Sequence, residues 1–122
     1  MRILDVDEIS VSEARGLTPH LLEGEVVHAA FRSASAAVLF TERRIVVVAR
    51  ETLLAEKIET SSFSYRAVRQ FATLEAHGEV RGEASRTALK IWLGTEPQPL
   101  QLRANAGTSL DSLQRLLASK LD

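Results

Sequence analysis

The sequence has no cysteine, only three prolines and few aromatic residues. Without cysteine there are no disulfides, no thiol nucleophile and no cysteine-ligated zinc. The longest apolar runs, residues 36–40 and 45–49, fall well short of the ~20 apolar residues that a membrane-spanning helix needs. The first eight residues include three acidic side chains, whereas a signal peptide starts with a basic region and an apolar run. We therefore expect a cytoplasmic protein.

The sequence also lacks an excess of charge of either sign. It has 15 basic and 16 acidic side chains, for a formal net charge of −1. This balance disfavours a nucleic-acid partner and a stable association with anionic membranes, because both depend on clustered positive charge. The length of 122 residues and the 45% hydrophobic content suit one globular domain, so we expect a single domain over residues 1–122.

Between residues 26 and 104 the apolar pattern predicts strands. Short apolar or alternating segments are separated by polar or glycine-containing stretches, which is typical of antiparallel sheets. Only Glu42 and Arg43 separate the second and third segments. Neither residue favours the positive φ of the commonest two-residue turn, so the spacing alone predicts a hairpin there. The predicted strands are residues 26–32, 36–41, 44–50, 55–62, 70–76, 87–93 and 100–104.

Within residues 26–104, only residues 63–68 have a less regular pattern that also allows a helical turn. The other segments that predict a helix lie before and after this range. In the N-terminal extension, residues 1–24, we expect one short helical turn over residues 18–24, capped by Thr18, with Pro19 in its first position and Gly24 at its exit.

The C-terminal segment, residues 108–121, predicts an amphipathic helix. Thr108 and Asp111 form a start like a capping box. A stripe of leucines then recurs at helical spacing; it comprises Leu110, Leu113, Leu117 and Leu121. About seven strands followed by one such helix predict a mainly β domain, in which the helix closes the open end of a sheet or barrel.

Several segments in this order resemble the first family of bacterial pleckstrin-homology (PH) domains. They are residues 22–25, 39–48, 63–71, 73–78 and 89–93, and together with the final helix they span residues 20–121. The resemblance implies a PH-like barrel or sandwich of about seven bent antiparallel strands with a C-terminal capping helix. It also implies a domain without catalysis that frequently assembles into rings.

The residues give no sign of a catalytic, metal or cofactor site. His20, His28 and His77 are far apart in sequence and lack the close ligand pairs of zinc sites. No serine lies in a Gly-x-Ser-x-Gly elbow, and the neighbouring carboxylates Glu23 and Glu25 would act as an acid and base pair only if they were buried together. We expect no enzyme and no cofactor.

The most informative side chains are basic or aromatic, and they are a possible surface for a ligand or partner. Their alternative roles are ion pairs on a soluble surface for the arginines, with nearby Glu42 as a partner, and packing for the tryptophan. This set comprises Arg43, Arg44, Arg66, Arg69 and Trp92.

Two functions therefore remain open. The first is a protein-interaction and self-assembly module with an unknown protein partner, forming a homo-oligomer through sheet edges, which closes into a ring when the rotation of the contact permits. In this hypothesis residues 36–41 and 44–50 lack protection against pairing unless they are central strands. The second is a binder of lipid head groups or small anions. The loop of residues 32–35 has one cation, Arg32, which disfavours phosphoinositide binding.

Overall fold

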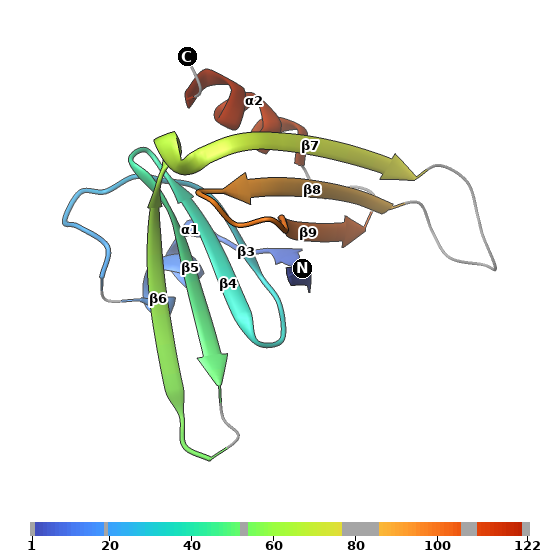
Figure 1. Cartoon of the computed structure of the whole chain (residues 1–122). Coiled ribbons are helices and arrows are strands. Elements are labelled where there is room, and N and C mark those ends of the chain that lie inside the picture. Colours follow the sequence, from blue (N-terminus) through green and yellow to red (C-terminus); the bar gives the residue numbers. More distant parts are fainter. Residues whose placement is uncertain (1, 19, 52–53, 77–85, 106–109, 121–122) are drawn as a thin grey trace. The chain divides into compact units, whose positions relative to one another are not determined.

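The computed structural model describes residues 2–18, 20–51, 54–76, 86–105 and 110–120. Within these residues the strands form two sheets, and a helix ends the chain (Figure 1). The chain divides into two compact units: residues 8–64 form one, and residues 1–7 with 65–122 form the other. The mainly β architecture predicted from the sequence is confirmed, with two separate sheets rather than one closed barrel.

The first sheet contains the hairpins that the sequence predicted. Its order is β2-β3-β4-β5-β6, and β3 to β6 pair as consecutive antiparallel neighbours. β4 and β5 are therefore central, so the two apolar segments suspected of being unprotected are covered on both edges. The strands are β2 (Asp7–Glu8), β3 (Val27–Arg32), β4 (Ala36–Thr41), β5 (Arg44–Glu51) and β6 (Lys57–Ser64).

Every residue of β4 is buried, so both faces of this strand are covered. On one face, a hydrophobic cluster contains residues from β3, β4 and β5 together with Ala14 of the helix α1 (Val11–Leu17), and Leu17 packs against it. This face of the sheet, which α1 covers in part, is called the α1 face below. The sheet members of the cluster are Val27, Ala30, Ala37, Leu39, Val46 and Val48.

The N-terminal prediction is wrong in the position of its helix. The helix α1 spans Val11–Leu17, and the Ser10 side chain caps it by accepting a hydrogen bond from the Glu13 amide at 3.2 Å. Thr18 is extended backbone at the end of α1, and its hydroxyl accepts a hydrogen bond from the His20 amide at 3.2 Å, as a cap would. The described residues that follow, 20–24, form turns and not a helix. Gly24 has φ +77° in a turn closed by the Glu25 amide and the Leu22 carbonyl, so it serves a turn. Pro19 lies outside the described residues.

The second sheet has the order β1-β9-β8-β7. β7 (Val68–Ala76), β8 (Arg86–Leu93) and β9 (Leu100–Asn105) match the predicted strands, and the 3-10 helix η1 (Tyr65–Ala67) falls where a helical turn was considered. β1 (Arg2–Asp5) was not predicted; it pairs in parallel with β9. Residues 77–85, between β7 and β8, lie outside the described residues.

The C-terminal helix α2 (Leu110–Lys120) confirms the predicted leucine stripe. Leu110, Leu113 and Leu117 are 4%, 1% and 0% exposed. The Lys120 ammonium lies 5.5 Å from the centre of the Tyr65 ring, so the end of α2 also contacts η1. Thr108, the predicted cap, and Leu121 lie outside the described residues.

Candidate functional site

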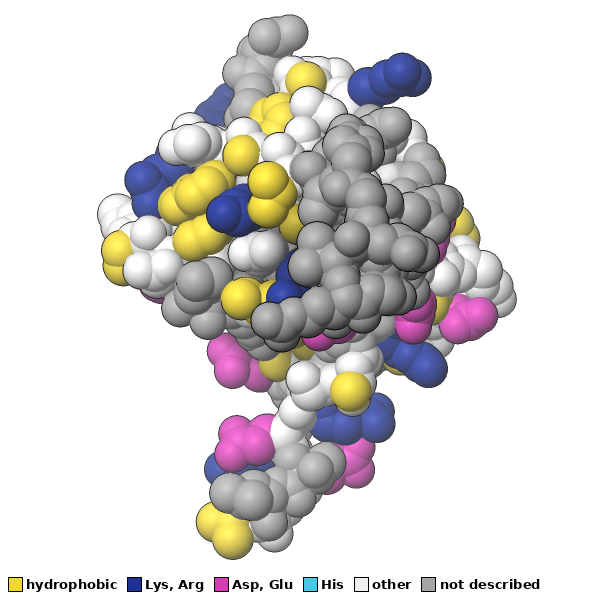
Figure 2. All heavy atoms as spheres, turned by 90° about the vertical axis from the view of Figure 1, so that its right-hand side faces the viewer, with side chains coloured by type: hydrophobic (Ala, Val, Ile, Leu, Met, Phe, Trp, Pro, Cys, Tyr) yellow, Lys and Arg dark blue, Asp and Glu magenta, His cyan; other side chains and the backbone are white. Residues whose placement is uncertain are grey.

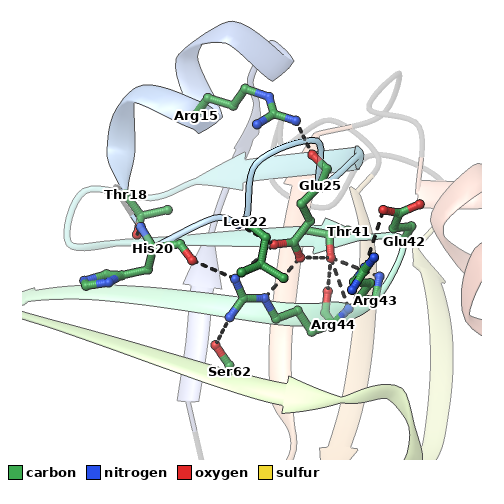
Figure 3. A network of polar contacts seen from close by, with 10 residues as sticks. All are labelled: Arg15, Thr18, His20, Leu22, Glu25, Thr41, Glu42, Arg43, Arg44 and Ser62. Carbon is green, nitrogen blue, oxygen red and sulfur yellow. Dashed lines mark hydrogen bonds and ion pairs between the residues drawn. The ribbon is translucent and has the colours of Figure 1, made fainter.

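A buried ion pair lies at the end of the first sheet that carries the β4–β5 hairpin (Figure 3). The Glu25 side chain is fully buried, and one of its oxygens lies 3.0 Å from Nη2 of Arg44. Nε of Arg44 donates to the other oxygen at 3.1 Å, which makes the pair bidentate. The Thr41 hydroxyl and the Leu22 amide also donate to the carboxylate, at 2.6 and 3.0 Å.

These contacts fix the charge of both partners. The hydrogen bonds from Arg44, helped by those from Thr41 and Leu22, lower the pKa of Glu25 from 4.5 to about 2, although burial opposes this. The pair also raises the pKa of Arg44 above its ordinary value. The remaining Arg44 donors reach the Ser62 hydroxyl at 2.9 Å and the His20 carbonyl at 2.8 Å. Arg44 is therefore used within the chain to join three segments of the first unit.

The same network holds the β4–β5 turn, for which the sequence offered no turn chemistry. The Thr41 hydroxyl accepts hydrogen bonds from the amides of Arg43 and Arg44 at 3.1 and 3.0 Å. A side-chain hydroxyl thus satisfies the turn amides, and this replaces the glycine or asparagine expected in a two-residue hairpin.

The other predicted site residues fall into separate groups. Arg43 is exposed and lies 3.7 Å from Glu42, a contact between solvent-exposed charges. Arg66, Arg69 and Trp92 belong to the second unit, where Arg66 is in η1. Arg69 lies at a register irregularity in β7, next to the cross-strand pair of Gln70 and Trp92, and donates to the Glu96 carbonyl.

Trp92 is half-buried on a face of the second sheet that mixes apolar and charged groups. By register, this face also holds Lys90 and Leu74, and Leu74 is 53% exposed. The bidentate ion pair of Arg103 with Asp5, at 2.9 and 3.0 Å, lies on the same face. Figure 2 shows hydrophobic side chains beside basic ones on the side of the molecule where β7 ends and β8 begins. Such a mixture is typical of surfaces that contact proteins.

Sequence reasoning missed a hollow at the opposite end of the first sheet. It has a volume of about 340 Å³. Two arginines contribute to its lining, Arg32 from β3 and Arg50 from β5. The Arg50 amide donates to the Ser35 carbonyl at 2.8 Å. Arg50 is therefore a second cation next to the loop of residues 32–35, for which the sequence indicated only Arg32. The position of Arg50 could have been predicted from the hairpin spacing, because a two-residue turn at Glu42 and Arg43 sets Ser35 opposite Arg50.

Metal ligands do not gather anywhere in the described residues, where no group of three histidine, cysteine or acidic side chains could hold an ion. His20 and His28 are exposed, and His77 lies outside the described residues. Glu23 is exposed while Glu25 is buried, so these two carboxylates are not buried together. Among the described helices, none has the length and apolar character needed to span a membrane.

The sheet edges differ in length. At one edge of each sheet the strand is short, four residues in β1 and two in β2. At the other edge it is long, eight residues in β6 and nine in β7. Short edge strands offer little backbone to another chain, whereas long ones offer a row of hydrogen-bonding groups.

Comparison with known proteins places this arrangement in a family. The sequence model of the bacterial PH domain matches residues 3–121. The chain is a bacterial PH domain. It is 30% identical to the uncharacterized protein YjqA of Bacillus subtilis over 100 residues, which cover 81% of this chain and 77% of that protein.

Two solved structures confirm the PH-like fold of this bacterial PH domain. A DUF1696 family protein with a pleckstrin-homology domain from Shewanella loihica superposes with a TM-score of 0.71 at 20% identity, covering 95% of this chain and 97% of that one. A pleckstrin-homology domain from Shewanella amazonensis gives a TM-score of 0.64 at 23% identity, covering 90% and 96%.

Proposed function

We propose that this bacterial PH domain is a non-catalytic protein-interaction module that assembles with copies of itself through its long sheet edges. The observation that carries the proposal is the edge strand β6 (Lys57–Ser64). Within the described residues, its outer side pairs with no strand. Its charges, Lys57 and Glu59, lie in the first half, and residues 60–64 have neither a charge nor a proline. Edges of monomeric proteins usually have such guards.

A strand from another copy could add to this edge through main-chain hydrogen bonds. The second sheet offers a comparable edge in β7, where Leu74 is 53% exposed. Two different long edges on each copy favour a head-to-tail contact, which closes into a ring when its rotation permits and otherwise extends. The near-zero net charge sets no strong repulsion against self-association.

The face with Trp92 supports contact with a further protein. A half-buried tryptophan on the same sheet face as an exposed leucine and paired charges has the composition of an interface centre with a polar rim.

Analytical ultracentrifugation at micromolar concentration tests the assembly. We expect a species heavier than the 13.4 kDa chain. Thr60→Lys adds a charge to the unguarded part of β6 and should shift the population toward 13.4 kDa. Ser12→Lys adds the same charge to the exposed side of α1 and should leave the assembly unchanged. A single species at 13.4 kDa across the dilution range would contradict the proposal, and unchanged assembly of Thr60→Lys would exclude β6 as its edge.

A further inference from the structure

The hollow at the β3–β4 hairpin has an apolar floor and a basic rim. Ala37 and Val48 are 4% and 8% exposed, and Leu17 of α1 lies beside them. Arg32 and Arg50 line the same hollow and are exposed. The remaining lining residues are Ser33, Ala34, Ser35, Ala36 and Ile58. A volume of about 340 Å³ lies at the lower end of the ~300–1,000 Å³ range of small-molecule sites.

Strand register brings the two arginines to the same face of the sheet. Arg32 is paired with Ala37, Ala37 with Val48, and Arg50 with Ile58. Residues directly opposite in a sheet, and those two apart along a strand, point to the same side. Both guanidinium groups therefore belong to the α1 face, above the apolar floor, and come from strands separated only by β4.

Hydrogen bonds fix the hairpin that forms one wall. The Ser33 amide donates to the Ala36 carbonyl at 2.8 Å, and the Ser33 hydroxyl accepts from the Ala36 amide at 3.1 Å. The Arg50 amide holds the Ser35 carbonyl at 2.8 Å. This wall of the hollow is thus pre-organised, which lowers the ordering cost of binding a ligand.

Both cations remain available. Among the described residues the Arg32 side chain has no hydrogen-bond or ion-pair partner. Arg50 lies 3.6 Å from Glu56, and the two side chains are 57% and 62% exposed. An ion pair that is so exposed contributes little, so a ligand anion can replace it at low cost.

We propose that this pocket binds a small amphiphilic anion, namely a phosphate or carboxylate head group with a short apolar chain. The head group would contact the guanidinium groups of Arg32 and Arg50, whose planar donors match both kinds of oxyanion. The apolar chain would lie on Leu17, Ala37 and Val48, where a bare inorganic ion would gain nothing. The site does not depend on self-assembly, because every lining residue comes from one chain and one unit.

Titrations of the full chain, followed by amide chemical shifts in NMR, test this pocket. The probes are hexyl phosphate, hexanoate, inorganic phosphate and hexanol. We expect saturable shifts at residues 33–37 and 48–50 with the two amphiphilic anions. Hexyl phosphate should bind at least about tenfold more tightly than inorganic phosphate, since each fully buried methylene is worth about fourfold in affinity. Hexanol, which has no charge, should bind more weakly than both anions.

Variants separate the pocket from general attraction to basic side chains. Arg32→Gln should weaken hexyl phosphate binding by about tenfold, as expected for the loss of a charge-assisted contact. The matched control Arg43→Gln removes an exposed arginine at the opposite end of the sheet and should leave the dissociation constant within about twofold. Arg32 has no partner within the described chain, so its variant should fold, as its amide spectrum would show.

Vesicles with and without an anionic phospholipid distinguish a soluble ligand from a lipid head group. Binding to the soluble probes alone supports the pocket and assigns it a soluble ligand. Co-sedimentation with anionic vesicles that Arg32→Gln abolishes supports the same pocket with a lipid as the source. Absence of saturable shifts at 33–37 and 48–50 with both anions and with vesicles would overturn the proposal. Equal loss of binding in Arg32→Gln and Arg43→Gln would also overturn it.

Discussion

The two ends of the first sheet use arginine in opposite ways. At the β4–β5 end, Arg44 is bidentate on a fully buried carboxylate and also binds Ser62 and the His20 carbonyl. At the β3–β4 end, Arg32 has no partner among the described residues, and Arg50 has only an exposed contact at 3.6 Å. Residue type alone does not separate these roles. The role of each arginine depends on whether another part of the chain places a buried carboxylate next to it.

This difference has an energetic consequence. A buried ion pair is costly to break, because removing one partner leaves a largely desolvated charge without its counter-charge. An exposed arginine retains its hydration, and its removal is nearly neutral for folding. The β4–β5 end should therefore govern stability, while the β3–β4 end is free to serve binding.

The largest expected effect comes from breaking the buried pair. Glu25→Ala should lower the free energy of unfolding by about 3–5 kcal/mol, because it leaves the Arg44 guanidinium without its carboxylate. Arg32→Ala should change it by less than about 0.5 kcal/mol. Urea denaturation at one fixed protein concentration measures both. Glu23→Ala, an exposed carboxylate in the same turn, is the control and should resemble Arg32→Ala. Equal losses for Glu25→Ala and Glu23→Ala would show that the pair does not hold this end of the sheet.

The second largest effect is expected in the leucine stripe of α2, which stabilises the fold through apolar packing instead of an ion pair. Leu117→Ala and Leu113→Ala should each lower the free energy of unfolding by about 2–5 kcal/mol, since each leaves a cavity in a closely packed site. Leu116→Ala, at a half-buried position on the same helix, should cost less than either. Unlike the loss in Glu25→Ala, these losses should be the same at pH 3 and pH 7. Denaturation curves equal to that of the wild type would mean that the stripe does not contribute to the core.

Most of the fold could be predicted because its signals are local. The segments that became β3, β4 and β5 are apolar runs bounded by charges, and the α2 stripe repeats at the helical period. The N-terminal region failed for two physical reasons. β1 is four residues long and pairs with a strand almost a hundred positions away, so no local pattern marks it. In α1, the Ser10 cap and the buried Ala14 outweigh the low helix propensity of Gly16.

The candidate sites depended on contacts that spacing alone does not reveal. The predicted contact with Glu42 is present for Arg43. Arg44 was recognised as a notable cation, but its bidentate partner is Glu25, nineteen positions away. Arg50, the second cation of the pocket, differs from Arg44 in this respect, because its position follows from the hairpin register. Counting outward from the turn at Glu42 and Arg43 sets Arg50 opposite Ser35, and the structure has this register. A loop should therefore be judged together with the residues that its register places beside it.

Acid should remove the contribution of the buried pair. The pKa of Glu25 is about 2 in the folded chain and 4.5 in its ordinary state. A lowered folded pKa stabilises the fold above the unfolded pKa, and this stabilisation is lost as the pH falls from about 4.5 to about 2. The loss should reach up to about 3 kcal/mol. The measurement is the difference in unfolding free energy between wild type and Glu25→Gln at pH 7 and pH 3, so that other carboxylates cancel. A difference that does not shrink at low pH would contradict this assignment.

The smallest expected effect tests the exposed ion pair at the β3–β4 end of the first sheet, in contrast to the buried pair at the β4–β5 end. Glu56 is the only anion that the described structure sets within ion-pair distance of Arg50. Glu56→Gln should change the free energy of unfolding by less than about 0.5 kcal/mol, because both partners are more than half exposed. It should nevertheless strengthen hexyl phosphate binding by about two- to threefold, since a competing carboxylate is removed from the rim. Glu59→Gln, which removes the same charge from the opposite face of β6, should alter neither quantity. Weaker binding in Glu56→Gln would mean that this carboxylate positions Arg50 for the ligand instead of competing with it, and equal strengthening in both variants would trace the effect to net charge alone.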